Sequence, residues 1–142
     1  MGDTQRLGVY MHSRTFDLAR SAYLADLDTL PDGPESLGAW IDRAIATHAD
    51  LTPDRRAAVA GLLDPETRDV RGRSRSFVVS ATAVEKMTAA VIADRQSGRI
   101  LSRGEFVSEA IRSSARVSSG RLGTPLPRPP SRLPNRPPRG IH

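Results

Sequence analysis

The chain contains no cysteine, a single lysine, six aromatic side chains and no long run of apolar residues. The absence of cysteine excludes disulfides, thiol catalysis and cysteine-bound metals. A transmembrane helix needs about 18 consecutive apolar residues, and a secretory signal needs a shorter apolar stretch near the N-terminus. Neither is found in the sequence, which therefore predicts a soluble cytoplasmic protein without a membrane partner.

Residues suited to catalysis are also few. The three histidines, His12, His48 and His142, do not recur at metal-ligand spacing, and no glycine-rich phosphate loop or nucleophile motif occurs. The carboxylates of residues 26–69 show no pairing pattern. We therefore expect no enzyme activity, no cofactor and no metal site, and we expect His48 at the surface or at a helix end.

The charge that is present is divided unevenly between the halves of the chain. Residues 1–70 carry seven arginines and twelve acidic residues, a net charge of −5. Residues 71–142 carry thirteen arginines and one lysine against four acidic residues, a net charge of +10. A polyanion would therefore meet the second half first. The alternative is a solvated basic surface without a partner.

The sequence also repeats its own pattern. Residues 9–26 align with residues 77–94 without a gap, and residues 36–45 align with residues 102–111. Identities are few, but polar and apolar positions match almost throughout. Each copy changes from a period of two residues to a helical period, which predicts a strand, a helix, a turn and a second helix in both.

Local signals are clearest in the second copy. Phe77 and Val79 occupy alternate positions of the predicted strand, and Ser80 is suited to cap the helix that follows. Ser102 and Glu105 form the S-x-x-E pattern of a capping box at the start of the last helix.

These patterns predict a mainly α fold with a short β-ribbon, in four parts. Residues 1–49 form a first, acidic strand-helix-helix unit, and residues 50–70 form a linker with a short helix begun by Thr52-Pro53. Residues 71–115 form a second, basic strand-helix-helix unit. Residues 116–142 contain seven prolines, six arginines and no acidic residue, which predicts a disordered tail.

One such unit is too small to bury an adequate core. Two units can pair their strands antiparallel into a two-stranded ribbon that closes over the helices, so that folding and pairing become one event. The chain can associate with itself in this way through its own two copies or through like copies of two chains in a homodimer. The sequence leaves both arrangements open.

Pairing would leave one face of the ribbon exposed, and a two-stranded ribbon fits the major groove of double-stranded DNA. If Phe77 and Val79 face the core, strand alternation points a set of residues in both copies outward. These candidate base-reading residues are Ser74, Ser76 and Val78, with Arg6, Gly8 and Tyr10 in the first copy. Arginine forks onto guanine, serine bonds several bases and valine contacts a thymine methyl. The alternative is an ordinary edge strand.

Basic residues beside the ribbon are candidates for phosphate contacts. Arg71, Arg73 and Arg75 flank or belong to the second strand. Ser102 and Arg103 stand at the start of a helix, where free backbone N–H groups form an anion site. The corresponding helix start of the first copy lacks the arginine and has acidic neighbours, so we expect it to repel phosphate.

The block RSFVVSATAVEKMTAAVIADRQSGRILSRGEFVSEAIRSSA, residues 75–115, resembles the ribbon-helix-helix domain of the MetJ/Arc superfamily. It is most similar to the centromere-binding ParB-type partition proteins of actinobacterial plasmids, and residues 47–63 resemble the helical segment that precedes the domain there. The resemblance implies two ribbon-helix-helix units that bind repeated operator-like or centromere-like DNA sites. It further implies an autorepressor associated with the plasmid or nucleoid, and a Walker-type partition ATPase as a partner.

The same domain also serves antitoxins and relaxosome accessory proteins. The alternative function is therefore an interaction protein whose basic tail, residues 116–142, binds a protein partner.

Overall fold

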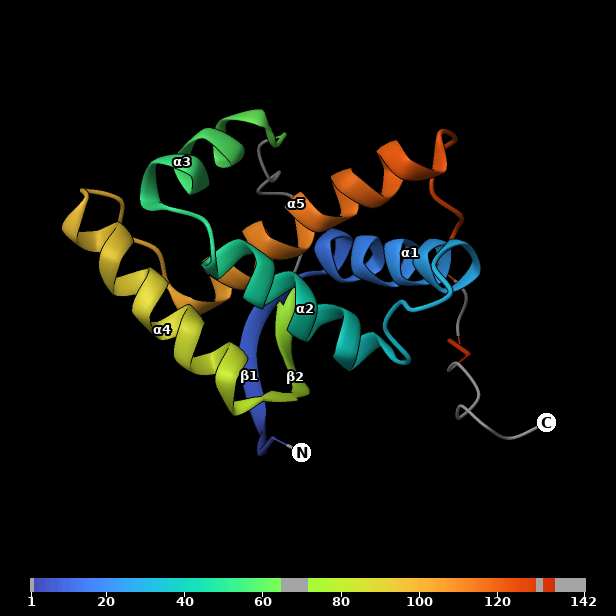
Figure 1. Ribbon diagram of the computed structural model, residues 1–142, viewed down its shortest axis with the longest axis horizontal. Helices are drawn as coiled ribbons and strands as arrows, with labels where there is room; N and C mark the ends of the chain where they lie inside the picture. Colours follow the sequence, from blue (N-terminus) through green and yellow to red (C-terminus); the bar gives the residue numbers. More distant parts are fainter. Residues whose placement is uncertain (1, 65–71, 130–131, 135–142) are drawn as a thin grey trace.

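A computed structural model of the chain describes residues 2–64, 72–129 and 132–134. Within them the fold is mainly helical, with one two-stranded antiparallel sheet (Figure 1). The elements follow in the order β1 (Thr4–His12), α1 (Ser13–Thr29), α2 (Leu37–Ala49), α3 (Pro53–Leu62), β2 (Gly72–Ser80), α4 (Ala81–Gln96) and α5 (Arg103–Leu122). Among these helices, none is both long enough and apolar enough to cross a membrane.

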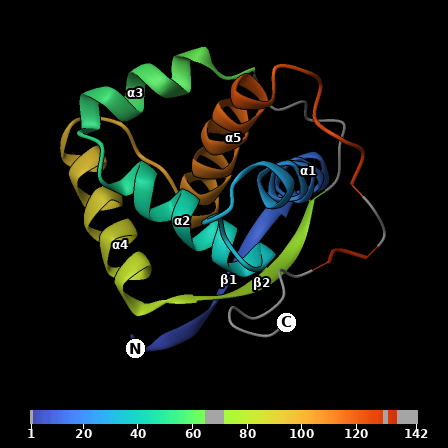
Figure 2. The same cartoon turned by 45° about the vertical axis from the view of Figure 1, so that its right-hand side comes forward.

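The sheet pairs one strand from each half of the chain. β1 runs antiparallel to β2, with Thr4 opposite Ser80 and His12 opposite Gly72. The ribbon therefore forms within one chain, which is one of the two arrangements that the sequence left open. Figures 1 and 2 show the helices gathered on one side of this ribbon.

Side chains from both strands and from the helices fill a single core. Leu7, Val9 and Met11 of β1 and Val79 of β2 are buried on the inner face of the ribbon, while Phe77 is half-buried. Large buried side chains from the helices meet them: Tyr23, Trp40, Ile41, Ile45, Met87, Phe106, Val107 and Ile111. The alternation expected for both strands thus gives the ribbon one apolar and one exposed face.

The prediction of two strand-helix-helix units is wrong. The elements are ordered β-α-α-α-β-α-α, and α3 interrupts the repeat. The halves are not separate structural units either, because β1 pairs with β2, α1 packs on α5, and α2 packs on α4 and α5. Each half is too small to bury its own apolar surface, so the two share one core instead of forming two units.

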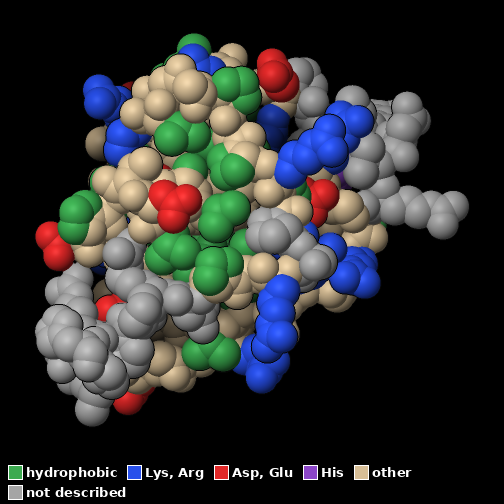
Figure 3. Space-filling model, turned by 90° about the vertical axis from the view of Figure 1, so that its right-hand side faces the viewer, with side chains coloured by type: hydrophobic (Ala, Val, Ile, Leu, Met, Phe, Trp, Pro, Cys, Tyr) green, Lys and Arg blue, Asp and Glu red, His purple; other side chains and the backbone are tan. Residues whose placement is uncertain are grey.

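The predicted disordered tail is also wrong in part, because α5 continues through residues 116–122. Asp26 of α1 holds this last stretch, accepting hydrogen bonds from Ser118 (2.9 Å) and Arg121 (3.0 Å). Beyond the helix, Leu126 and Leu133 pack against the core. Figure 3 shows the side of the molecule on which α1 and α5 end, where basic and acidic side chains lie around a central apolar patch. Polar partners on α1, rather than an apolar stripe, stabilise this stretch.

The starts of α2, α3, α4 and α5 agree with the local sequence signals. The hydroxyls of Ser36, Thr52, Ser80 and Ser102 each accept a hydrogen bond from the backbone N–H three residues further on. The capping box predicted for Ser102 and Glu105 is confirmed, since both of its hydrogen bonds are present at 3.1 Å.

A buried ionic network ties α3 into the core. Arg56 is 1% exposed and donates hydrogen bonds of 2.9–3.1 Å to Asp94 of α4. It also donates to backbone carbonyls at the end of α2. Arg99 lies 3.5 Å from the same carboxylate and forks onto Glu109 of α5 at 2.7 and 2.8 Å. His48 completes the network at 2.8 Å from Glu109. It lies in the last turn of α2, which confirms the expected position at a helix end, but its side chain is buried and not at the surface.

Arg56→Met should lower the free energy of unfolding by about 3–5 kcal/mol, because it leaves the Asp94 carboxylate buried without its main partner. Urea titration followed by circular dichroism measures this change. The matched control is Arg55→Met, which removes an exposed arginine from the same helix and should leave stability nearly unchanged. Equal effects of the two substitutions would contradict the role given to Arg56.

The network also predicts loss of stability in acid. Burial acts to raise the pKa of Glu109, but hydrogen bonds from Arg99 and His48 outweigh it and hold the pKa at about 2, below the ordinary value of 4.5. A carboxyl whose pKa is lowered by folding stabilises the protein above its unfolded pKa and loses that contribution as the pH falls. Stability should therefore decline between about pH 4.5 and 2. Glu109→Gln should flatten this decline, whereas Glu85→Gln, at an exposed position, should not.

Candidate nucleic-acid interface

The exposed face of the ribbon carries the residues predicted to read bases. Arg6 lies opposite Val78, Gly8 opposite Ser76, and Tyr10 opposite Ser74, so all six alternate with the buried positions. Tyr10 is 65% exposed and Val78 is 55% exposed, although both are large apolar side chains. We call these six residues the outer ribbon face.

The outer ribbon face is polar with two apolar side chains. Arg6 donates a hydrogen bond of 3.2 Å to the hydroxyl of Ser76 across the strands, and the Tyr10 hydroxyl accepts one of 3.2 Å from the backbone of Gly72. Both arrangements hold the donor and acceptor groups on the surface of the ribbon. The face can therefore offer a guanidinium, hydroxyls and a methyl-bearing side chain to a ligand in one strip.

The arginines predicted to hold phosphates differ in their surroundings. Arg73 is exposed near the start of β2. Arg75 is half-buried, and its guanidinium lies 3.7 Å from the centre of the Phe16 ring. Desolvation and the charge of Arg73 lower the pKa of Arg75. Arg75 therefore fixes β2 to α1 through a cation–π contact and is less accessible to phosphate. Arg71 lies outside the described residues.

The alternation of side chains along β2 already predicts that Arg75 faces the helices and not the solvent. Arg75 has the same parity as Phe77 and Val79, so its side chain begins on the inner side of the ribbon. An arginine at such a position needs an acceptor or a ring beneath it. Phe16, aligned with no aromatic residue in the second copy, supplies that ring.

Two glycines bring the starts of α2 and α5 against the ribbon. A Cβ atom at Gly104 would lie 2.8 Å from the backbone oxygen of Tyr10, and one at Gly38 would lie 3.1 Å from the backbone oxygen of Val78. Ser102 and the exposed Arg103 therefore stand beside the ribbon, although the hydroxyl oxygen of Ser102 already accepts the capping hydrogen bond. A phosphate there would meet the remaining N–H groups of the first turn and the Arg103 side chain.

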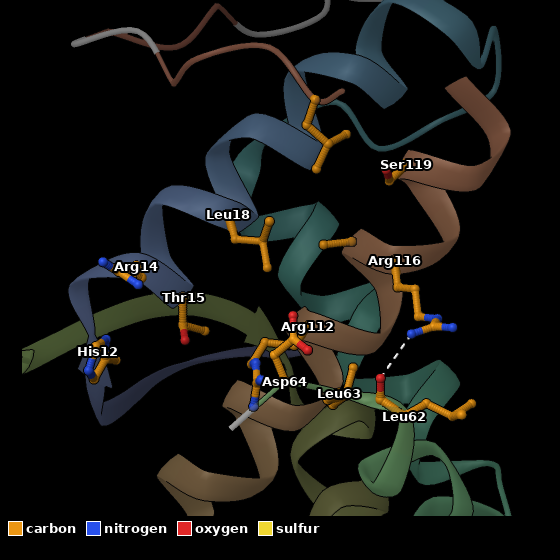
Figure 4. Close-up of a pocket in the computed structure, with 12 residues that line it drawn as sticks. His12, Arg14, Thr15, Leu18, Leu62, Leu63, Asp64, Arg112, Arg116 and Ser119 are labelled. Carbon is orange, nitrogen blue, oxygen red and sulfur yellow. Dashed lines mark hydrogen bonds between the residues drawn. The ribbon is translucent and has the colours of Figure 1, made fainter. Parts of the chain in front are cut away.

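A separate cavity of about 370 Å³ lies between α1, α5 and the end of α3 (Figure 4). Arg14, Arg112 and Arg116 line it around an apolar wall that includes Leu18, and Arg116 donates a hydrogen bond of 2.9 Å to the backbone oxygen of Leu62. Sequence reasoning missed this site because its residues come from distant segments. Three guanidiniums against the one carboxylate of Asp64 give the cavity lining an excess of positive charge, which favours an anion.

In the described part of the chain, no cluster of three or more histidine, aspartate or glutamate side chains is placed to hold a metal ion. The buried acidic residues Asp26, Asp94 and Glu109 instead form hydrogen bonds with tryptophan, arginine and histidine side chains. Asp26, for example, accepts a hydrogen bond of 2.8 Å from the indole of Trp40.

The comparisons with known proteins found no matching family model, no matching curated protein and no matching solved structure. The resemblance of residues 75–115 to the ribbon-helix-helix domain therefore stays a prediction. Inferences about the function of this chain depend on its own sequence and geometry.

The close approach of α5 to the ribbon can be tested with two glycines of the same helix. Gly104→Ala should lower the free energy of unfolding by about 1–3 kcal/mol, because the new methyl group would overlap the Tyr10 carbonyl. Gly120→Ala has open space around it and should raise stability by about 0.5–1 kcal/mol. Thermal and urea unfolding of both variants measure these opposite signs. A stabilising Gly104→Ala would mean that α5 does not begin against the ribbon.

Proposed function

We propose that the chain is a sequence-specific DNA-binding protein that inserts the β1–β2 ribbon into the major groove. One observation carries the proposal: the six residues of the outer ribbon face lie on a single exposed strip of a two-stranded antiparallel sheet. A ribbon of this width fits the major groove, which is about 12 Å wide and presents a different pattern for each base pair.

The chemistry of the strip suits base edges. Arg6 can fork onto the two acceptors of guanine, the hydroxyls of Ser74 and Ser76 can donate or accept, and Val78 can contact the methyl group of thymine. The exposed side chains of Val78 and Tyr10 leave apolar surface in contact with water in the free protein. Contact with DNA would cover both.

Charge next to the ribbon supports the same proposal. Arg73 lies at one end of β2, and Arg103 follows the capping serine of α5 beside β1. Neutralising DNA phosphates releases bound counterions, which favours binding at low salt and fixes the protein in register on the duplex. The basic second half of the chain, with a net charge of +10, supplies most of this attraction.

The biological role within this class rests on the sequence resemblance. It supports a plasmid partition adaptor and autorepressor that binds centromere-like repeats, associates with the nucleoid or plasmid and works with a Walker-type ATPase. For the alternative of a tail that binds a protein partner, the described residues give no support. Leu126 and Leu133 pack on the chain's own core, and the hydroxyl of Tyr23 donates to the carbonyl of Pro134 at 2.8 Å.

Substituting one arginine of the outer ribbon face tests the proposal. Duplexes that bind the full chain would first be selected from a random-sequence pool, and affinity would then be measured by fluorescence anisotropy on a selected and a scrambled duplex. Arg6→Ala should reduce discrimination between them by about 1–3 kcal/mol, because it removes a contact to a base edge.

The matched control is Arg55→Ala, which removes the same charge from α3 on the far side of the domain from the ribbon (Figure 1). It should weaken binding to both duplexes slightly and equally. If Arg6→Ala behaves in the same way as this control, Arg6 does not read bases. If the pool yields no preferred sequence at all, the protein is not a sequence-specific reader.

A further inference from the structure

The two ends of the outer ribbon face are related by the sequence repeat. The aligned glycines Gly38 and Gly104 approach the aligned residues Val78 and Tyr10, each on the strand from the other half of the chain. Gly8 faces its aligned partner Ser76 directly. The middle of the ribbon therefore lies at this pair, with Arg6 and Val78 at one end and Tyr10 and Ser74 at the other.

Two identical strands would present the same side chains at both ends and would suit a palindromic DNA site. In this chain every aligned pair differs. Arg6 is matched by Ser74, Gly8 by Ser76, and Tyr10 by Val78. The Arg6 end offers a guanidinium and an aliphatic side chain, whereas the Tyr10 end offers two hydroxyls and an aromatic ring.

The surroundings of the two ends differ in charge as well. The start of α5, with Arg103, lies against Tyr10, and Arg73 is opposite Met11 at the same end. The start of α2 lies against Val78 and carries Leu37 in place of the arginine, with the exposed carboxylate of Glu35 two residues before it. Phosphate attraction is therefore concentrated at the Tyr10 end.

We infer that the DNA site of this chain is asymmetric and that the chain binds it in one orientation. The inference rests on the proposed function. Rotating the protein by half a turn on the same duplex would exchange a guanidinium for a hydroxyl over the bases and a basic for an acidic helix start over the phosphates. Both exchanges oppose binding, so the two orientations are not equivalent.

Selection of duplexes from a random-sequence pool tests the asymmetry of the DNA site separately from the DNA-binding function. A preferred sequence without two-fold symmetry is the expected result. A palindromic preferred sequence would overturn the inference and leave the DNA-binding function intact, whereas the absence of any preferred sequence would overturn both.

Orientation can be measured directly because the chain has no cysteine of its own. Asp3→Cys places a single thiol before β1, at the Arg6 end of the ribbon, where the side chain is exposed. A DNA-cleaving iron chelate attached to this thiol should cut the duplex on one flank of the selected site only. Cleavage of both flanks to the same extent would show binding in both orientations and would end the inference.

A symmetrised ribbon provides the converse test. The triple substitution Arg6→Ser, Gly8→Ser and Tyr10→Val gives β1 the same three outward side chains as β2. A Cβ atom at Gly8 meets no atom within 4 Å, so the added side chain has room. The preferred sequence of this variant should become palindromic over the bases that the ribbon covers. An unchanged asymmetric preference would show that these side chains do not set it.

Discussion

Antiparallel pairing of β1 with β2 is the interaction on which the rest of the structure depends. The ladder joins the two halves of the chain and gives the sheet one face that covers the helices and one that remains exposed. It also positions the helices, because α2 and α5 each begin against a backbone carbonyl of the ribbon at Gly38 and Gly104. The outer ribbon face and the helix starts beside it are therefore fixed by one and the same pairing.

The ionic network of Arg56, Asp94, Arg99, Glu109 and His48 holds the opposite side of the domain. Removing a guanidinium and a carboxylate from water is costly, and only several well-aligned hydrogen bonds offset that cost. Arg56 meets this condition, since it joins Asp94 to the carbonyls that end α2. The network therefore joins α2, α3, α4 and α5 on this side of the domain.

Patterns between close neighbours in the sequence predicted the strand faces and helix starts well. The parity of Phe77 and Val79 placed Ser76 and Val78 outward, and the S-x-x-E signature placed the start of α5. Interactions between distant residues escaped prediction. Nothing near Arg56 in the sequence identifies Asp94 as its partner, 38 residues away, so the sequence predicts α3 only as a linker helix and not its contact with α4. The helical extension through residues 116–122 escaped for the same reason, because Asp26 on α1 stabilises it.

The order of the strands along the chain has a consequence during synthesis. β1 and the first three helices leave the ribosome before β2 has emerged from it, so Leu7, Val9 and Met11 then have no partner strand and Arg56 has no Asp94. An unpaired apolar strand edge is a template for another chain. During the time needed to translate from β1 to β2, the β1 strand of one nascent chain can pair with a neighbouring chain on the same messenger RNA. Once its own β2 has emerged, β1 can pair within its own chain.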